Sequence, residues 1–467
     1  MMTETDVDAQ TPDINRAAAP SVVAQPIWWQ ILMLAWPALV QQGLLLTIQL
    51  YDQYLTGKFS ESHKAALTTA NYLYWFVTSY TVVVNAGATA LVGRLVGAKD
   101  LPLAQKACGQ AMLLALLFGV LGSVSAFLGL PTLIPLLGLK GESAQFAIDY
   151  LRPLAGLLPF YMIEVGGIAC LVGAGDTRTG LKVLATVVVV NVPLAWGLSR
   201  GESLFPDLGF LGIAWGTGLA HVIGCLLVLV TLARGRYGLK LDLASLLPDR
   251  ALTVRLLRVS IPAAIDSLSV GVFQFVFLAM VNDLGKTAAS AHGIAIRLEG
   301  LGYLSGAAFA TATAAIVGRA LGAKRPDIAA RGAWTAFAFG CGIMSVMGVV
   351  FFIFARPMFE LFNPDPNQVA VIDTGVPVLR LIAFAMPGLA GSIILTQALR
   401  GAGDTRVPVL FTWVGFVGVR LPLAYGLTVV LDHGLLGAWL AMFIDIYVRG
   451  AFFLWRFAGG KWKTARV

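Results

Sequence analysis

An acid and several amides fall on one face of the first long apolar stretch of the sequence. Asp52 lies three residues after Gln49, and Gln42 and Gln53 lie seven residues before and four residues after Gln49. Residues at these spacings share a face of a helix. An ionisable residue inside an apolar span is costly and usually faces an internal cavity. Asp52 is therefore the first candidate for a cation-binding residue, with a proton or Na⁺ as the ion.

The second apolar stretch carries a matching row of polar side chains. Five residues recur at spacings of three or four: Asn71, Tyr74, Thr78, Thr81 and Asn85. Two polar rows on adjacent helices predict a wet pocket, in which amide oxygens such as those of Gln49 or Asn71 would complete a Na⁺ site with Asp52. The alternative is that the rows only join the helices by hydrogen bonds and that Asp52 caps a helix at the membrane interface.

A second group of candidates lies in the other half of the chain. Asp266 and Gln274 belong to the seventh apolar stretch, and Arg297 and Glu299 belong to the eighth. Glu299 lies 13 residues after Lys286, roughly 20 Å along a helix and so near the middle of a bilayer. A neutral Glu299 or an Arg–Glu ion pair would both satisfy burial there. The structural alternative is an ion pair that only fixes the seventh and eighth spans.

Further ionisable residues lie inside predicted spans, among them Glu164, Arg420 and Asp445. Such residues usually pair with one another or line a cavity. The sequence leaves open whether Arg420 pairs with Asp445 and whether an arginine pairs with Asp266.

The sequence carries no set of residues typical of a catalytic centre. Its four cysteines, at positions 108, 170, 225 and 341, all fall inside predicted spans and have no metal-ligand spacing. We find no Gly-Lys-Ser/Thr phosphate loop and no convincing Ser/His/Asp set. We therefore expect neither an enzyme nor a bound cofactor, and no metal ion other than Na⁺ at Asp52.

Twelve long apolar stretches must position the candidate residues. Of the 467 residues, 58% are hydrophobic and 12% are charged, whereas about 25% are charged in soluble domains. A membrane-spanning helix needs about 20 apolar residues. The composition predicts an all-α polytopic membrane protein whose spans lie near 27–56, 66–93, 105–138, 145–173, 179–200, 209–233, 257–284, 288–318, 330–361, 371–399, 407–431 and 434–456.

The basic residues indicate the orientation in the membrane. The net charge is +8, and six of the cations lie between Arg234 and Arg258. Most of the others fall in the tails and in the loops that follow even-numbered spans. Since cytoplasmic loops are enriched in lysine and arginine, we place both termini in the cytoplasm. This distribution explains the charge without a nucleic-acid partner.

The sequence repeats itself at an offset of 225 to 229 residues. Residues 92–99 (VGRLVGAK) return as 317–324 (VGRALGAK), and the hexapeptide GAGDTR at 173–178 is repeated unchanged at 401–406. Residues 193–198 also return as 422–427, and Pro37 matches Pro262. Each half holds six spans, an even number, so the two halves face the same way. The repeat predicts two parallel six-helix lobes with a substrate site between or inside them.

These boundaries give a five-part organisation. We expect a disordered cytoplasmic tail over 1–26, an N-lobe over 27–233, a cytoplasmic linker over 234–256, a C-lobe over 257–456 and a cytoplasmic tail over 457–467.

Taken together, the motifs resemble those of the MATE (multidrug and toxic compound extrusion) transporters over residues 27–456. The resemblance rests on Pro37, on the segment YDQYLTG at 51–57, on both copies of the two repeated loops and on AHGIAIRLE at 291–299. It implies two V-disposed lobes and export of organic, mostly cationic compounds, driven by the inward flow of H⁺ or Na⁺. Asp52 matches the protonatable acid that the family carries in its first span.

The resemblance also bears on the branch and the setting. The DinF-type members carry an Asn…Asp-Pro pattern, whereas this chain has Asn191-Val192-Pro193 without an acid. A DinF-like bacterial branch and either coupling ion therefore stay open. We expect a monomer in the bilayer of the cytoplasmic (inner) membrane, with small organic molecules as its substrates. The alternative is a lipid-linked precursor flippase of the same superfamily, which would favour a strongly cationic cavity.

Reporter fusions test the predicted topology. Lys140 and Lys286 follow the third and the seventh span, so reporters joined there should give an external signal if both termini are cytoplasmic. Alkaline phosphatase and green fluorescent protein fusions measure the two outcomes. A cytoplasmic signal at either position would contradict the division into two six-span lobes.

Overall fold

The computed structural model describes residues 25–202, 205–362 and 369–465. These residues contain twelve helical spans long and apolar enough to cross a membrane, which confirms the all-α polytopic fold. The first six spans are α1 (Ile27–Thr56), α2 (Glu61–Gly97), α3 (Leu101–Leu136), α4 (Gly141–Ala174), α5 (Thr177–Arg200) and α6 (Phe210–Ala233). The next four are α7 (Arg250–Asp283), α8 (Lys286–Gly322), α9 (Pro326–Ile353) and α11 (Val369–Gly401). The eleventh runs from Arg406 to Val430, and α14 (Gly434–Ala458) is the twelfth.

Two of the C-lobe spans are less regular than the sequence predicts. The ninth span ends at Ile353 and is followed by the short helix α10 (Ala355–Phe362). The eleventh consists of α12 (Arg406–Trp413), a π-helical stretch over Val414–Arg420, α13 (Leu421–Tyr425) and a second π-helical stretch over Gly426–Val430. Such stretches are rare and are often found at functional sites. Here the first one ends on Arg420.

The structure shifts two of the expected boundaries. The side chain of Asp249 accepts a hydrogen bond from the Leu252 N–H at 3.1 Å and caps α7. This helix therefore begins at Arg250, and residues 250–256 of the expected linker are helical. At the other end, α14 continues to Ala458, and Trp462 in the following 3₁₀ turn is buried. The expected N-terminal tail over 1–26 lies outside the described residues except for Gln25 and Pro26.

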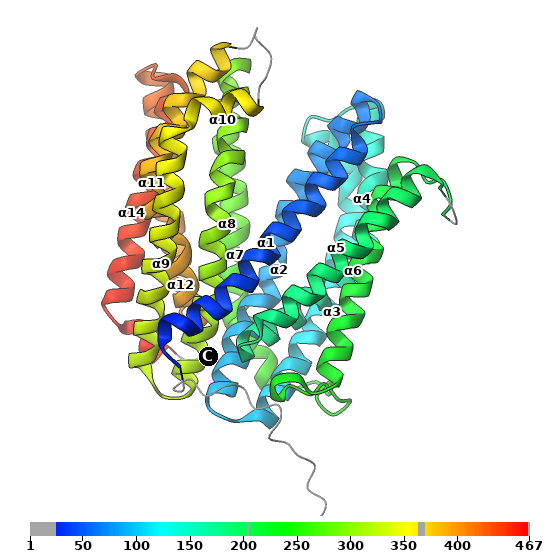
Figure 1. Ribbon diagram of the computed structural model, residues 1–467, viewed down its shortest axis with the longest axis vertical. Helices are drawn as coiled ribbons and strands as arrows, with labels where there is room; N and C mark the ends of the chain where they lie inside the picture. Colours follow the sequence, from blue (N-terminus) through cyan, green and yellow to red (C-terminus); the bar gives the residue numbers. More distant parts are fainter. Residues whose placement is uncertain (1–24, 203–204, 363–368, 466–467) are drawn as a thin grey trace, which may run out of the picture.

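The two six-helix lobes meet at one end and diverge at the other (Figure 1). We call the end where α1 begins and where the chain ends the tail end. Two helices cross between the lobes there: Ile31 of α1 packs into the C-lobe core, whereas Ile48 packs against α5 and α6. In the same way, Leu256 of α7 lies in the N-lobe core and Phe277 lies in the C-lobe core.

Two glycines of the repeat bring the lobes into backbone contact at the tail end. A Cβ atom on Gly97 would overlap the carbonyl oxygen of Arg319, and a Cβ atom on Gly322 would overlap the carbonyl oxygen of Arg94. Gly97 and Gly322 are equivalent in the repeat, as are the two arginines. The halves therefore meet through the same contact made twice, and a side chain at either glycine would hold them apart.

The repeated GAGDTR loops also have matching structures. Gly175 and the glycine 228 residues later have φ angles of +97° and +86°, a left-handed conformation that glycine adopts readily. Asp176 forms an ion pair with Arg236 at 2.8 Å, and its equivalent Asp404 forms one with Arg456 at 2.8 Å. The hydrogen bond to Asp176 raises the pKa of Arg236. Each loop is thereby fixed to the end of the sixth span of its lobe.

Alanine at Gly97 or Gly322 should separate the lobes at the tail end, because the atom in the way is a backbone carbonyl that cannot rotate aside. Lys106 and Arg331 are exposed, equivalent positions on α3 and α9. Spin labels at Lys106→Cys and Arg331→Cys, in a background without native cysteines, should show a longer mean distance by pulsed electron resonance in either variant.

Gly342→Ala is the matched control, since a Cβ atom at Gly342 would meet no atom within 4 Å. It should leave the label distance unchanged. An unchanged distance in Gly97→Ala and in Gly322→Ala would show that the lobes do not depend on this contact.

Candidate functional site

The side chain of Asp52 lies inside the N-lobe, where α1, α4, α5 and α6 meet, and is buried. Thr217 donates its hydroxyl to Oδ2 of Asp52 at 3.2 Å, and Tyr150 donates to the same oxygen at 3.4 Å. Asn191 donates its Nδ2 to the Thr217 oxygen at 2.9 Å. Asp52 thus has hydroxyl partners, and it forms no ion pair within the described part of the chain.

This arrangement is suited to holding a small cation. A buried carboxylate without an ion-pair partner is costly until a proton or a cation neutralises it. The buried Oδ1 of Asn191 has no hydrogen-bond partner. With the oxygens of Asp52 and Thr217, it makes a set of oxygen donors, the type of ligand that hard cations prefer. The cluster of Asp52, Tyr150, Asn191 and Thr217 is hereafter the Asp52 cluster.

A second acid in the N-lobe interior is paired with a histidine. Oε2 of Glu164 on α4 is 2.8 Å from Nδ1 of His221 on α6, and both side chains are almost fully buried. His221 follows Thr217 of the Asp52 cluster by four residues on the same helix face. The N-lobe therefore buries two carboxylates, Asp52 and Glu164, and neither has a lysine or arginine partner among the described residues.

In contrast to Asp52 and Glu164, two buried acids of the C-lobe are ion-paired with arginines. Asp445, fully buried on α14, accepts hydrogen bonds from Arg420 and from Arg449 at 2.7 to 2.8 Å. The ring of Phe416 lies 4.3 Å from the Arg420 guanidinium and 4.7 Å from the Arg449 guanidinium. Arg420 also donates to Gln274 at 3.1 Å. The pairing of Arg420 with Asp445, which the sequence left open, is therefore present, and both charges are fixed by it.

Two further acids of the C-lobe spans are Asp266 and Glu299. Asp266 on α7 pairs with Arg400 on α11 at 2.6 Å. Its other oxygen, Oδ1, and Nε of Arg400 are buried without a hydrogen-bond partner. Glu299 on α8 is partly exposed. Its charge interacts with that of Arg420, but the two do not form an ion pair within the described residues.

Several residues predicted from the sequence lie elsewhere than expected. Gln49, Asn71 and Arg297 are exposed, and none of them makes a side-chain hydrogen bond to another described residue. The oxygens beside Asp52 come instead from α4, α5 and α6. Arg297 does not pair with Glu299, because side chains two residues apart point to different faces of a helix.

Part of the polar row on α2 is hydrogen-bonded within its own helix, whereas the buried Oδ1 of Asn85 has no hydrogen-bond partner. Thr78 donates to the carbonyl of Trp75 at 2.8 Å, and Asn85 donates to Thr81 at 3.1 Å. Tyr74 lies close to Tyr161 of α4 and to the charge of Glu164. Only this member of the row therefore reaches the buried acids of the N-lobe.

Sequence reasoning missed Tyr150, Thr217 and His221, and it treated Asn191 only as part of a motif lacking its acid. Tyrosine and threonine are common in membrane spans, so nothing marks Tyr150 or Thr217 in the sequence alone. His221 could have been found, because an ionisable residue inside a span is a candidate by itself.

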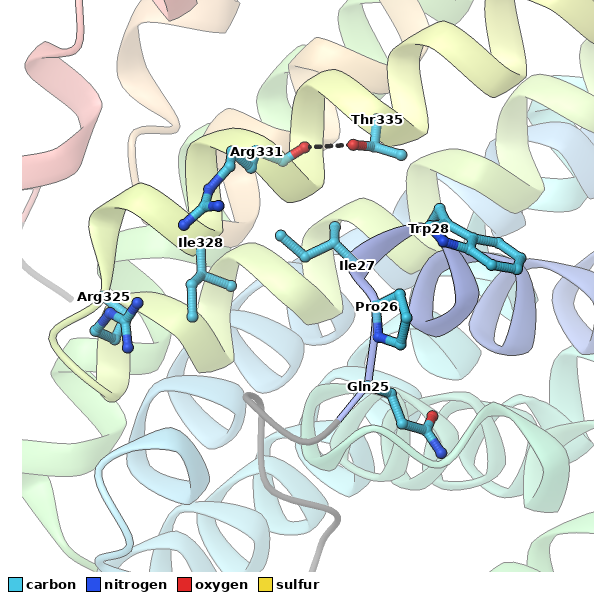
Figure 2. Close-up of a pocket in the computed structure, with 8 residues that line it drawn as sticks. All are labelled: Gln25, Pro26, Ile27, Trp28, Arg325, Ile328, Arg331 and Thr335. Atoms are coloured by element: carbon cyan, nitrogen blue, oxygen red, sulfur yellow. Dashed lines mark hydrogen bonds between the residues drawn. The ribbon is translucent and has the colours of Figure 1, made fainter.

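One hollow at the surface is separate from these clusters. It has a volume of about 500 Å³ and lies at the tail end between the starts of α1 and α9, as Figure 2 shows. Arg325 and Arg331, which line it, both pair with Asp327. Asp52 lies 25 residues beyond Ile27 on α1, which is roughly 38 Å along a helix. This hollow is therefore not part of the Asp52 cluster.

Comparisons with known proteins give one family. The MatE family model matches residues 37–196 and 262–426, one segment in each lobe. The probable multidrug resistance protein NorM of Thermotoga maritima is 28% identical over 444 residues, which are 94% of each protein. The uncharacterized transporter YisQ of Bacillus subtilis is 24% identical over 439 residues, 93% of this chain and 95% of that protein.

Solved structures with the same fold are also found. A multidrug resistance MATE family transporter in an outward-facing conformation matches with a TM-score of 0.88 at 21% identity, over 95% of this chain and 99% of that one. A MOP superfamily transporter from Pyrococcus furiosus matches equally well, with a TM-score of 0.88 at 20% identity over the same shares. At this level of identity the likeness concerns the fold.

Asp445→Asn should destabilise the protein, because it leaves the buried guanidinium groups of Arg420 and Arg449 without a counter-charge. Removing one partner of a buried ion pair costs about 3–5 kcal/mol, so the thermal midpoint in detergent should fall clearly. Asp373→Asn is the control: its pair with Arg356 is exposed, and exposed pairs contribute about 0–1 kcal/mol. Equal midpoints for the two variants would show that the Asp445 pairs do not stabilise the C-lobe.

Proposed function

The chain belongs to the MatE (multidrug and toxic compound extrusion) family, and from that premise we propose that it is a secondary-active antiporter that exports organic cations. The proposed driving force is the inward flow of H⁺ or Na⁺ across the cytoplasmic membrane. The names of its relatives, multidrug resistance proteins among them, support amphiphilic organic compounds as the substrate class.

One observation carries this proposal: Asp52 is buried inside the N-lobe with hydroxyl partners and has no ion-pair partner among the described residues. Such a carboxylate is stable only when a mobile positive charge neutralises it. A proton or Na⁺ and an organic cation can each do so, but not at the same time. This competition couples the two flows, because the empty, charged site is too costly to persist through the conformational change.

The difference between the lobes supports the N-lobe as the exchange site. Asp445 and Asp266 in the C-lobe are bound to arginines at 2.6 to 2.8 Å, so their charges are already compensated. A proton or a substrate cation would have to displace a guanidinium to reach them. Glu299 of the C-lobe is not ion-paired within the described residues, so we assign it a minor role in cation exchange.

The polarity of the N-lobe also argues against a flippase for lipid-linked precursors. A diphosphate headgroup needs several cations around it. The N-lobe interior instead buries Asp52 and Glu164, and a negatively charged headgroup would be repelled there.

In the proposed cycle, the contact between the lobes at the tail end determines which side of the membrane is closed. If both termini lie in the cytoplasm, the contacts at Gly97 and Gly322 close the cytoplasmic side while the lobes diverge on the outside. Export then requires those contacts to open, so that an organic cation can enter from the cytoplasm. These contacts involve backbone atoms, which cannot adjust gradually. We therefore expect the lobes to switch between two discrete arrangements, one closed and one open at the tail end.

Asp52→Asn should abolish gradient-driven transport and leave the amount of folded protein unchanged. Asparagine keeps the size and hydrogen bonds of the side chain but cannot lose or gain a charge. In reconstituted vesicles under a separately imposed pH or Na⁺ gradient, the wild type should accumulate ethidium on the side richer in the driving ion. The variant should show no accumulation above protein-free vesicles.

Asp149→Asn serves as the control and should transport normally, since Asp149 is a partly exposed acid on α4 that is paired with Arg152. Glu299→Gln should have a smaller or substrate-dependent effect. If Asp52→Asn transports normally while Glu299→Gln is inactive, the exchange site lies in the C-lobe and the present assignment is wrong.

A further inference from the structure

The pair formed by Glu164 and His221 is buried and tightly packed in the N-lobe. The two side chains are 1% and 7% exposed, so water cannot compensate their charges freely. A Cβ atom on Gly224, one turn after His221 on α6, would lie 2.8 Å from Oε1 of Glu164. The bare backbone of Gly224 thus makes the space in which the carboxylate sits.

The short contact between Glu164 and His221 requires one hydrogen between the two side chains and leaves a second proton-binding position free on the imidazole. At 2.8 Å between Oε2 of Glu164 and Nδ1 of His221, one hydrogen must lie between the two atoms. Nε2 of the imidazole can then take up a second proton without disturbing that hydrogen bond. The pair can therefore change its net charge from −1 to zero with its geometry unchanged.

Among the described residues, neither Glu164 nor His221 forms an ion pair with a lysine or an arginine. Tyr161 on α4 lies edge-on to the His221 ring at 4.8 Å, and Tyr74 on α2 and Cys225 on α6 are within reach of the charge of Glu164. The charged residues of α2, α3 and α5 lie within about two turns of the helix ends, at positions 61, 63, 64, 94, 106, 178, 182 and 200. The net −1 state of the pair therefore has no arginine or lysine partner among the described residues.

The pair is linked to the Asp52 cluster through α6 and through charge. Thr217, which donates to Asp52, lies four residues before His221 on α6, or roughly 6 Å along the helix. The charge of His221 is close enough to interact with that of Asp52. The charge states of the two sites are therefore interdependent, and a change at one site alters the free energy of protonation at the other.

We propose that Glu164 and His221 form a second proton-binding site in the N-lobe, filled and emptied together with Asp52 in each transport cycle. The proposal rests on the antiport function proposed above. A proton from water binds Nε2 of His221 while the hydrogen on Nδ1 keeps its hydrogen bond to the Glu164 carboxylate, and the proton on Nε2 is later released to water on the other side. With one proton at each site, two protons flow in for each monovalent organic cation exported, so the exchange moves net charge.

The ratio of protons to substrate tests this proposal in reconstituted vesicles. With the membrane potential held at zero and a pH difference of about one unit, a two-proton exchanger concentrates ethidium about 100-fold on the acidic side, and a one-proton exchanger about 10-fold. We expect about 100-fold for the wild type and about 10-fold for Glu164→Gln and His221→Gln. The membrane potential should drive the wild type but not these two variants.

His292→Gln is the matched control. His292 is also a buried histidine, on α8, but its partner is the indole of Trp439 at 3.1 Å and not a carboxylate. Its substitution should leave the roughly 100-fold ratio unchanged. A ratio that stays the same in Glu164→Gln and His221→Gln would overturn the proposal, as would a ratio of about 10-fold in the wild type.

The outcomes separate this proposal from the antiport function itself. If no gradient drives ethidium transport by the wild type, antiport of ethidium fails and the second site fails with it. If only Na⁺ drives transport, antiport stands and the second proton site is wrong. Should both variants fail to fold, infrared difference spectra of the wild type with isotope-labelled histidine replace them. Loss of an imidazolium signal on ethidium addition supports the proposal, and no change in histidine signals overturns it.

Discussion

A charge inside a membrane protein has to be compensated within the protein, and this constraint separates the two lobes. In the C-lobe, Asp266 and Asp445 are held by arginines at 2.6 to 2.8 Å. In the N-lobe, Asp52 has only hydroxyl partners, and Glu164 has a histidine. The two halves of the repeat therefore differ in how these buried acids are paired, and this difference is the basis of the exchange site proposed in the N-lobe.

The same repeat also provides the contact between the lobes. At the tail end they meet through Gly97 and Gly322, each against the backbone of the other lobe. Backbone contacts between small residues are typical of helix packing in membranes, where there is no hydrophobic force between helices. Because α1 and α7 each contribute to both cores, a change inside the N-lobe near Asp52 can reach the C-lobe along α1. The proposed coupling therefore has a continuous physical route.

The fold was largely predictable from the sequence, because span length, apolar composition and the repeat all report the same architecture. Asp52, Asp266 and Glu299 were found for a related reason: a charge in an apolar span stands out. Their partners were not predictable in the same way. Tyr150 and Thr217 reach Asp52 from positions 98 and 165 residues further along the chain, and the helical period says nothing about contacts between spans. The irregular eleventh span was also missed, since nothing in its composition distinguishes a π-helical stretch from a regular helix.

Release of protons on substrate binding tests the central claim most directly. The claim is that a proton and an organic cation compete for the buried carboxylate of Asp52. Ethidium added to the purified protein in weakly buffered detergent solution near neutral pH should release protons, measured with an indicator dye. Asp52→Asn should release fewer protons per bound ethidium than the wild type. Saturable ethidium binding by the wild type with no proton release, in solutions free of Na⁺, would contradict the account.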